Sequence, residues 1–334
     1  MELSRRPILA LMLALIFALM LATMLVPVST RAQDRYPTRP VRLIVGFAAG
    51  SSGDVAARIV ADKLGSLLGQ PVIVENKAGA SGMVATDYVA RAAKDGQTLL
   101  LATIAATINT SLMPNQGANF QNDLAPIVLI GSIPSILVVT PALKVGSVRD
   151  LIALAKAKPD ELLYGAAGIG SGPHMATRLF EQMAGIKMRG VLYPGSAQTV
   201  TDLIAGRIQV MFAPSPTVLG LIAEGRVKAL ASTEAKRTRV VPDLPTIAEA
   251  ALPGYDTGVW FGLLAPAGTP APIIDKLSRA ANEALREEQL VRQLGAQGLE
   301  VRGGSAEEFR AFIKSETERW ARVIDSMALT DKSK

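Results

Sequence analysis

Short apolar runs alternate with longer amphipathic segments from residue 40 onward, and Gly, Pro, Ser or Asn marks most of the turns between them. In the amphipathic segments the apolar residues recur every three or four positions, which is typical of a helix with one buried face. The short runs are rich in Val, Ile and Leu, as expected of buried strands. The pattern predicts strands at residues 41–47, 72–75 and 98–103 and helices at residues 54–68 and 83–93.

The alternation resumes after a predicted break at Pro134, which lies between apolar runs at residues 127–130 and 135–140. Because proline has no N–H to donate, we expect the sheet to be interrupted there. A second series of strands and helices is predicted at residues 148–157, 162–165, 173–184, 191–193, 210–212 and 229–232. The chain is therefore predicted to be an α/β protein with two lobes.

The C-terminal part returns to the first lobe in this interpretation. A Pro- and Gly-rich stretch at residues 252–258 is followed by a predicted strand at residues 260–265. Amphipathic helices are predicted at residues 272–285 and 306–328, and we expect them to pack on the first lobe. Two crossings between the lobes follow, one near each proline-containing break.

The N-terminal segment has the layout of an export signal. Arg5 and Arg6 precede an apolar run at residues 8–26, and small and polar residues follow as far as Ala32. Residues 1–32 are therefore predicted to be a signal peptide that directs export of the chain. The apolar run is also close to the length of a membrane-spanning helix, so an uncleaved anchor is the alternative.

Charge and cysteine content exclude several functions. The 334-residue chain has a formal net charge of +6, but its Lys and Arg residues are interleaved with acidic residues rather than gathered in a basic, aromatic-containing stretch. This pattern argues against a nucleic-acid partner. The chain contains no cysteine, so disulfides, thiolate metal sites and cysteine nucleophiles are all excluded.

Three predicted strand-to-helix turns, at residues 47–54, 165–173 and 193–196, are rich in Gly and Ser. Such turns leave the first N–H groups of the helix without a partner, and these groups with the helix dipole attract negative oxygen. Glycine and serine also occur there simply as helix caps, so one turn alone indicates little. Two turns from one lobe and one from the other favour a shared anion site between the lobes.

The sequence lacks most of the motifs that would indicate an enzyme. The glycine run at residues 165–172 lacks the third glycine of the dinucleotide-binding fingerprint, and neither a Walker A sequence nor a G-x-S-x-G nucleophile turn is present. His174 is the one histidine of the chain, and its place at a helix start favours a packing or capping role over a general base. Glu287-Glu288 and Glu307-Glu308 belong to charge-alternating helices and are expected at the surface. We therefore expect a binding protein with no cofactor and no metal.

Several segments resemble the periplasmic solute receptors of the tripartite tricarboxylate transporters, known as the Bug family. The similar segments include FAAGSSGDVAAR at 47–58, VENKAGASG at 74–82, DGQTLL at 95–100, SVRDLI at 147–152, residues 164–174 and LLAPAGTP at 263–270. These segments lie between residues 47 and 270, and the resemblance covers essentially the whole chain after the predicted signal peptide. The resemblance implies a type II periplasmic-binding-protein fold, in which two α/β lobes are joined by two crossings and enclose a cleft.

What the resemblance implies can be assigned to this numbering. The first lobe comprises residues 33–133 and 258–334 and the second lobe residues 134–257, after the signal peptide at residues 1–32. Backbone amides of facing turns, and of a loop at 103–107, would hold a ligand carboxylate. The predicted ligand-binding residues are Ala49, Gly50, Ser51, Ser52, Thr103, Thr107, Gly170, Ser171, Tyr193, Gly195 and Ser196.

The sequence also departs from the family pattern. Ala49 and Ser51 replace a proline and a glycine of the first turn, and Ala213 stands where an acidic residue often occurs. Loss of that carboxylate favours a plain mono- or dicarboxylate ligand over an amino acid. The resemblance implies a monomeric receptor that works with integral membrane transporter subunits. An exported enzyme acting on a carboxylate and a ligand sensor for a membrane kinase are the alternatives.

Overall fold

The computed structural model describes residues 36–114 and 117–326. The chain divides into two units, Met1–Thr38 and Arg39–Lys334, and all helices and strands given below belong to the second. The predicted signal peptide at residues 1–32 lies outside the described residues. In the described part of the chain, no helix combines the length and apolar character needed to cross a membrane.

A first half of the sheet contains strands β2, β1, β3 and β9 in that order. Strand β1 is parallel to β2 and β3, whereas β9 is antiparallel to β3. The strands of this half are β1 (Val41–Val45), β2 (Val72–Asn76), β3 (Thr98–Thr103) and β9 (Gly258–Pro266). All six residues of β3 are buried, as expected of a strand covered on both faces.

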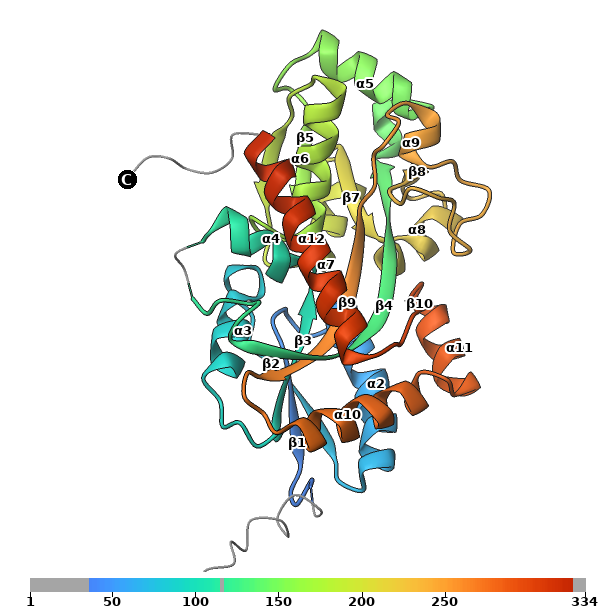
Figure 1. The fold of residues 1–334 in the computed structure, drawn as a ribbon. Helices are drawn as coiled ribbons and strands as arrows, with labels where there is room; N and C mark the ends of the chain where they lie inside the picture. The colour runs from blue at the N-terminus through green and yellow to red at the C-terminus, as the bar shows by residue number, and fades with distance from the viewer. Residues whose placement is uncertain (1–35, 115–116, 327–334) are drawn as a thin grey trace, which may run out of the picture. The chain divides into compact units, whose positions relative to one another are not determined.

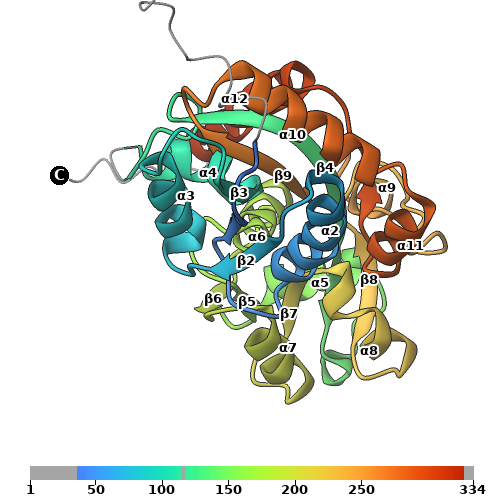
Figure 2. The same cartoon turned by 90° about the horizontal axis from the view of Figure 1, so that it is seen from below.

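Helices cover this first half on both sides. Figures 1 and 2 show α2 and α3 on opposite sides of β1 and β2. The elements that connect these strands are α2 (Ser52–Leu68), the 3₁₀ turn η3 (Ala80–Gly82), α3 (Met83–Ala90) and α4 (Ile104–Leu112). Helix α4 corrects the predicted loop at residues 103–107, because Thr103 caps a helix that begins at the next residue.

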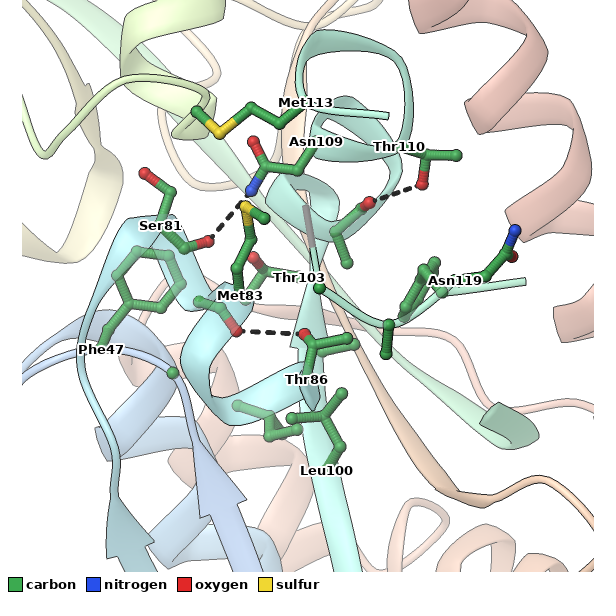
Figure 3. Close-up of a pocket in the computed structure, with 18 of the residues that line it drawn as sticks. Phe47, Ser81, Met83, Thr86, Leu100, Thr103, Asn109, Thr110, Met113 and Asn119 are labelled. Atoms are coloured by element: carbon green, nitrogen blue, oxygen red, sulfur yellow. Dashed lines mark hydrogen bonds between the residues drawn. The ribbon is translucent and has the colours of Figure 1, made fainter. Parts of the chain in front are cut away.

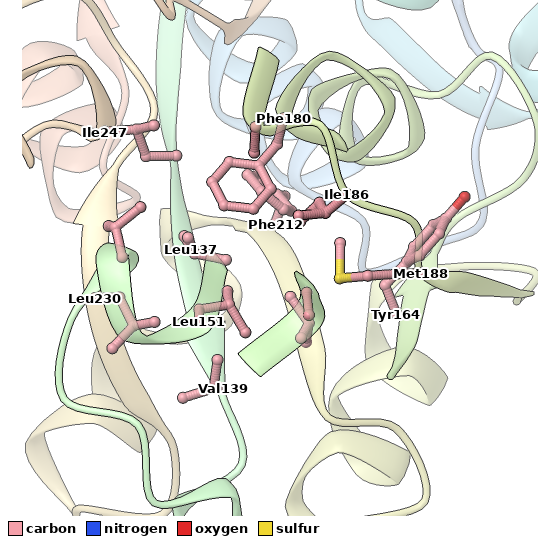
Figure 4. Close-up of a cluster of buried hydrophobic side chains, with 14 of the residues drawn as sticks. Leu137, Val139, Leu151, Tyr164, Phe180, Ile186, Met188, Phe212, Leu230 and Ile247 are labelled. Carbon is pink, nitrogen blue, oxygen red and sulfur yellow. The ribbon is translucent and has the colours of Figure 1, made fainter. Parts of the chain in front are cut away.

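A second half of the sheet contains β7, β5 and β6 in that order, with β5 parallel to both neighbours. Its strands are β5 (Leu163–Ala166), β6 (Arg189–Leu192), β7 (Val210–Pro214) and β8 (Lys228–Ser232). Its helical elements are η4 (Pro141–Leu143), α5 (Val148–Ala157), α6 (Gly172–Ala184), α7 (Ser196–Ile204), η5 (Ser215–Thr217), α8 (Leu219–Ala223) and α9 (Ile247–Ala250). Figure 4 shows the core of this half, where the Phe180 and Phe212 rings lie 5.4 Å apart.

Strand β4 (Leu124–Val139) runs through both halves, beside β9 (Figure 1). It pairs with β9 as far as Pro134, opposite Gly258, and from Ser135 onward it pairs with β7 and β8. The predicted interruption at Pro134 is therefore wrong, since a single strand spans it. The missing N–H causes no break because it falls where the strand changes partners. The lobe boundaries predicted at 133/134 and 257/258 lie at this level of the sheet and stay a prediction.

The C-terminal elements extend over both halves. They are α10 (Ala271–Ala284), α11 (Glu288–Ala296), β10 (Glu300–Val301) and α12 (Ala306–Ser326). Phe309 of α12 packs edge-on against Trp260 of β9, with ring centroids 5.9 Å apart. Further along the helix, Val323 packs on the core of the second half, and Ser326 Oγ accepts a hydrogen bond from Gln182 at 2.8 Å. Helix α12 thus contacts both halves, whereas the sequence assigned residues 258–334 wholly to the first lobe.

Candidate functional site

Four helix starts meet at one cavity of about 50 Å³. Helices α2 and α4 come from the first half, and α6 and α7 come from the second. The residues that line the cavity are Phe47, Ala48, Ser51, Ser52, Gly53, Thr103, Ile104, Ala167, Ser171, Gly172, Pro173, Pro194, Gly195, Ser196, Pro214, Val259 and Phe261. None of these residues carries a charged side chain. An anion bound here would therefore be held by peptide N–H groups and hydroxyls rather than by an ion pair.

The start of α2 shows which amides are available. Ser51 Oγ caps the helix by accepting a hydrogen bond from the Asp54 N–H at 3.3 Å, and the Ser51 amide donates to the Ala48 carbonyl at 3.2 Å. The Asp54 carboxylate accepts a hydrogen bond from the Gly50 amide at 2.9 Å. Among the described residues no partner engages the amides of Ser52 and Gly53. These two N–H groups are the donors that α2 offers to the cavity.

Asp54 is the buried anchor of this turn. Burial raises its pKa, but hydrogen bonds from Arg58, the Gly50 amide and Asn76 outweigh that effect and hold the pKa below its usual value. The carboxylate is therefore ionised at neutral pH and fixes the turn. It also occupies the Gly50 amide, which a ligand cannot then use.

The start of α6 repeats this arrangement in the second half. Ser171 Oγ accepts from the His174 N–H at 3.3 Å and donates to the Gly168 carbonyl at 2.8 Å. The Gly170 amide donates to His174 Nδ1 at 3.3 Å, so this amide is also engaged. Pro173 has no N–H, which leaves the Gly172 amide as the donor of this first turn.

The start of α7 has no side-chain cap. Gly195 is the N-cap residue, with an extended backbone, and it has no side-chain oxygen that could accept from the amides of the first turn. Among the described residues nothing accepts from the amides of Ser196, Ala197 and Gln198. Ser196 lines the cavity, so its N–H is the clearest free donor of the second half. At α4, in contrast, Thr103 Oγ1 accepts from the Ala105 N–H at 3.3 Å.

The structure brings six of the predicted site residues together at this cavity, namely Ser51, Ser52, Thr103, Ser171, Gly195 and Ser196. The other five do not line it. Gly50 and Gly170 have their amides engaged internally, and Ala49 is exposed. Thr107 is fully buried in α4 and donates to the Ile104 carbonyl at 2.8 Å. The Tyr193 hydroxyl donates to the Asp202 carboxylate at 2.7 Å.

The sequence analysis did not identify most of the apolar residues that line this cavity. Phe47, Ile104, Pro214, Val259 and Phe261 come from strand ends and a helix start that read as ordinary core positions. Phe261 lies within the strand predicted at residues 260–265, and Phe47 ends the strand predicted at residues 41–47. The Gly53 and Gly172 amides could have been found from the sequence. Gly172 directly follows Ser171, the cap of α6, and Gly53 lies two residues after Ser51, the cap of α2.

The environment of His174 makes it a hydrogen-bond acceptor rather than a proton-transfer group. Burial, with a smaller contribution from the charge of Arg178, lowers the pKa of His174 to about 4. Because the unfolded chain takes up a proton near the ordinary pKa of about 6.5 and the folded chain only near 4, the stability contributed by this group is lost as pH falls through that range.

We predict that the ring of this sole histidine titrates near pH 4 in a proton NMR experiment, without any assignment step. The free energy of unfolding should decline between pH 6.5 and 4, and less steeply in a His174→Gln variant, which cannot take up the proton. A midpoint near 6.5 would contradict the buried, accepting role of Nδ1.

Two α/β halves joined by shared strands, with free helix starts from both halves at one cavity, define a solute-binding protein of the two-lobed type. The family model described as the tripartite tricarboxylate transporter family receptor matches residues 56–329. Protein BugT of Bordetella pertussis is 39% identical over 293 residues, which cover 87% of this chain and 90% of BugT.

Solved structures agree with this match. R. palustris Rpa4515 with adipate is 36% identical, with a TM-score of 0.84, and the alignment covers 88% of this chain and 98% of that chain. MatC from Rhodopseudomonas palustris with bound malate is 30% identical, with a TM-score of 0.82 and coverage of 86% and 100%. The chain belongs to the tripartite tricarboxylate transporter receptor family of periplasmic solute-binding proteins. The family and the type II α/β fold predicted from the sequence are confirmed.

Proposed function

We propose that this chain is a periplasmic receptor that captures a small carboxylate between two lobes by hinged closure. It then delivers the ligand to membrane subunits of a tripartite tricarboxylate-type transporter. The signal peptide at residues 1–32 directs export in this proposal, and an uncleaved anchor is the alternative. The ligand leaves chemically unchanged. The alternatives from other classes are an exported enzyme acting on a carboxylate and a ligand sensor for a membrane kinase.

One observation carries the proposal: within the described part of the chain, the amides of Ser52, Gly53, Gly172 and Ser196 have no hydrogen-bond partner, and they border a cavity lined by no charged side chain. These amides come from both halves of the sheet. A hydrogen bond to a charged group contributes about 1.5–3 kcal/mol, so three or four of them provide a gross gain of roughly 5–12 kcal/mol. A micromolar Kd needs about 8 kcal/mol net. Because amides of each half contribute, a carboxylate binds best when both halves reach it, and that difference in affinity drives closure.

The ligands of relatives support the carboxylate class, since adipate and malate both carry carboxylates. Mass spectrometry of small molecules released from freshly purified protein is the direct test. A carboxylate recovered intact, together with a melting temperature that rises with its concentration, supports the receptor. Turnover of the bound molecule would favour the enzyme, and capture of a histidine-kinase ectodomain would favour the sensor.

Ala213 leads to a prediction about ligand charge. This residue is fully buried in β7, next to Pro214 of the cavity wall, and provides no carboxylate for a ligand amine. We expect succinate, citrate or aromatic acids to raise the melting temperature more than aspartate or glutamate at equal concentration, because a buried ammonium group without a partner is costly. A calorimetric panel in which the amino acids bind most tightly would contradict this prediction.

A further inference from the structure

A second and larger cavity adjoins the carboxylate cavity. It encloses about 210 Å³ inside the first half, between α3, α4 and the end of β3. Figure 3 shows Met83, Thr86, Thr110 and Met113 around it. Phe47 and Thr103 line both cavities, so the two spaces lie side by side.

The rim of this cavity involves both halves of the protein. Ser81 lines the cavity, and its hydroxyl donates to the Ile169 carbonyl of the second half at 2.5 Å. A Cβ atom on Gly168 would lie 3.0 Å from Ser81 Oγ, so the two segments are in close contact. A molecule held in the cavity is therefore enclosed by the same approach of the two halves that completes the carboxylate site.

The chemistry of the lining disfavours a charged occupant. None of the described residues that line the cavity carries a charged side chain. The hydroxyl hydrogens of Thr86 and Thr110 are donated to the carbonyls of Gly82 and Ala106, each at 3.0 Å, and that of Ser81 to Ile169. These hydroxyls have no hydrogen left for a carboxylate, while the two methionines offer soft apolar contact. The carboxamides of Asn109 and Asn119 also line the cavity, and Asn109 Nδ2 donates to the Ser81 carbonyl at 3.5 Å. These neutral amides suit an uncharged polar group, whereas a second carboxylate would lose its hydration without meeting a cation.

The volumes of the two cavities also indicate which part of a ligand each cavity would hold. An engineered apolar cavity of about 150 Å³ holds benzene, or roughly 25 Å³ for each heavy atom. On that scale the smaller cavity, about 50 Å³, has room for only about two heavy atoms, so it can take the oxygens of a carboxylate but not the rest of the ligand. The larger cavity, about 210 Å³, has room for roughly eight heavy atoms.

We propose that the larger cavity is the subsite for the ligand's body, and that the receptor prefers a monocarboxylate with an uncharged body of about five to eight heavy atoms. This inference rests on the proposed function, because the carboxylate is anchored at the helix starts. It narrows the ligand class from mono- or dicarboxylates to monocarboxylates.

A matched set of acids tests the inference on the unmodified protein. Hexanoate, 6-hydroxyhexanoate and adipate share a six-carbon chain and differ at the end distant from the anchoring carboxylate. We expect calorimetry to give a Kd for hexanoate and 6-hydroxyhexanoate at least tenfold lower than for adipate. Adipate binding as tightly as hexanoate, or none of the three binding while other carboxylates bind, would overturn the inference and leave the proposed function standing. If no carboxylate of any kind binds, the proposed function fails as well.

A substitution in the larger cavity tests whether the body of the ligand binds there. Thr110→Phe fills the larger cavity from α4, and we expect it to weaken hexanoate binding at least tenfold. The affinity for acetate, which has the carboxylate but no long body, should stay within twofold. Thr201→Phe is the matched control: Thr201 is exposed on α7, makes the equivalent hydrogen bond within its helix and lines neither cavity, so both affinities should stay unchanged. Equal loss of acetate and hexanoate binding in Thr110→Phe, or no loss of either, would contradict the proposed location.

Discussion

Replacing Ser196 by proline is expected to weaken carboxylate binding by about 10- to 100-fold while leaving the fold intact. Ser196 is the first residue of α7, where proline is well tolerated, and the extended backbone of Gly195 suits a residue that precedes proline. The substitution removes one unpartnered N–H from the cavity. A hydrogen bond to a charged group contributes about 1.5–3 kcal/mol, and about 1.4 kcal/mol corresponds to a factor of ten in Kd.

Ser196→Ala is the matched control, because it removes the hydroxyl and keeps the amide. Its affinity for the acid recovered from the protein should stay closer to that of the wild type than to that of Ser196→Pro. Ser52→Pro is the equivalent change at the first residue of α2, after Ser51 with φ −68° and ψ 159°, and it should give a loss of similar size. Isothermal titration calorimetry, with circular dichroism to check helix content, measures all three. Full affinity in both proline variants would show that these amides do not hold the ligand.

Replacing Gly262 by alanine is expected to produce the largest loss of stability, about 2–3 kcal/mol. A methyl group at this position would overlap the ring of Phe309. That ring cannot easily move, because it is 1% exposed and packs edge-on against Trp260. The backbone is also fixed, since Gly262 pairs with Ala102 of β3 on one side and Leu129 of β4 on the other.

Gly295→Ala provides the control for this prediction. Gly295 is an exposed residue of α11, and apart from the adjacent residues and the backbone of its own helix no atom lies within 4 Å of the position that its Cβ would take. Alanine favours the helix over glycine, so this variant should melt at the wild-type temperature or slightly above. Thermal and urea unfolding compare the two. A Gly262→Ala protein that melts within a degree of the wild type would mean that α12 can shift away from β9 at little cost.

The local elements of the fold could be predicted from the sequence because apolar spacing and turn residues determine them locally. Strands β1, β2 and β3 and helices α2 and α6 follow this rule closely. Strand β4 could not be predicted as one strand, because Pro134 reads as a break in any local pattern. The strand accommodates Pro134 because its pairing with β9 ends there, opposite Gly258, which is distant in the sequence.

The turns that form the candidate site could be predicted from the sequence, but the particular amides that are free to donate could not. A Gly/Ser turn before an amphipathic segment identifies a helix start, and three of these starts meet at the cavity. Which amide is free depends on partners that the turn itself does not reveal. The Asp54 carboxylate accepts a hydrogen bond from the Gly50 amide, and His174 Nδ1 accepts one from the Gly170 amide. Helix α4 was missed because Thr103 caps it directly after a fully buried strand, without an intervening turn.

The strand pair β4 and β9 has a consequence for the modularity of the receptor. Because β4 belongs to the sheet of both halves, neither half can be excised or exchanged with that of a relative without cutting through a hydrogen-bonded ladder. Helix α12 adds a second tie, since it packs against Trp260 at one end and the core of the second half at the other. Recombination within this family is therefore expected to preserve the two halves as a matched set, and new ligand preferences to arise from substitutions around the cavities.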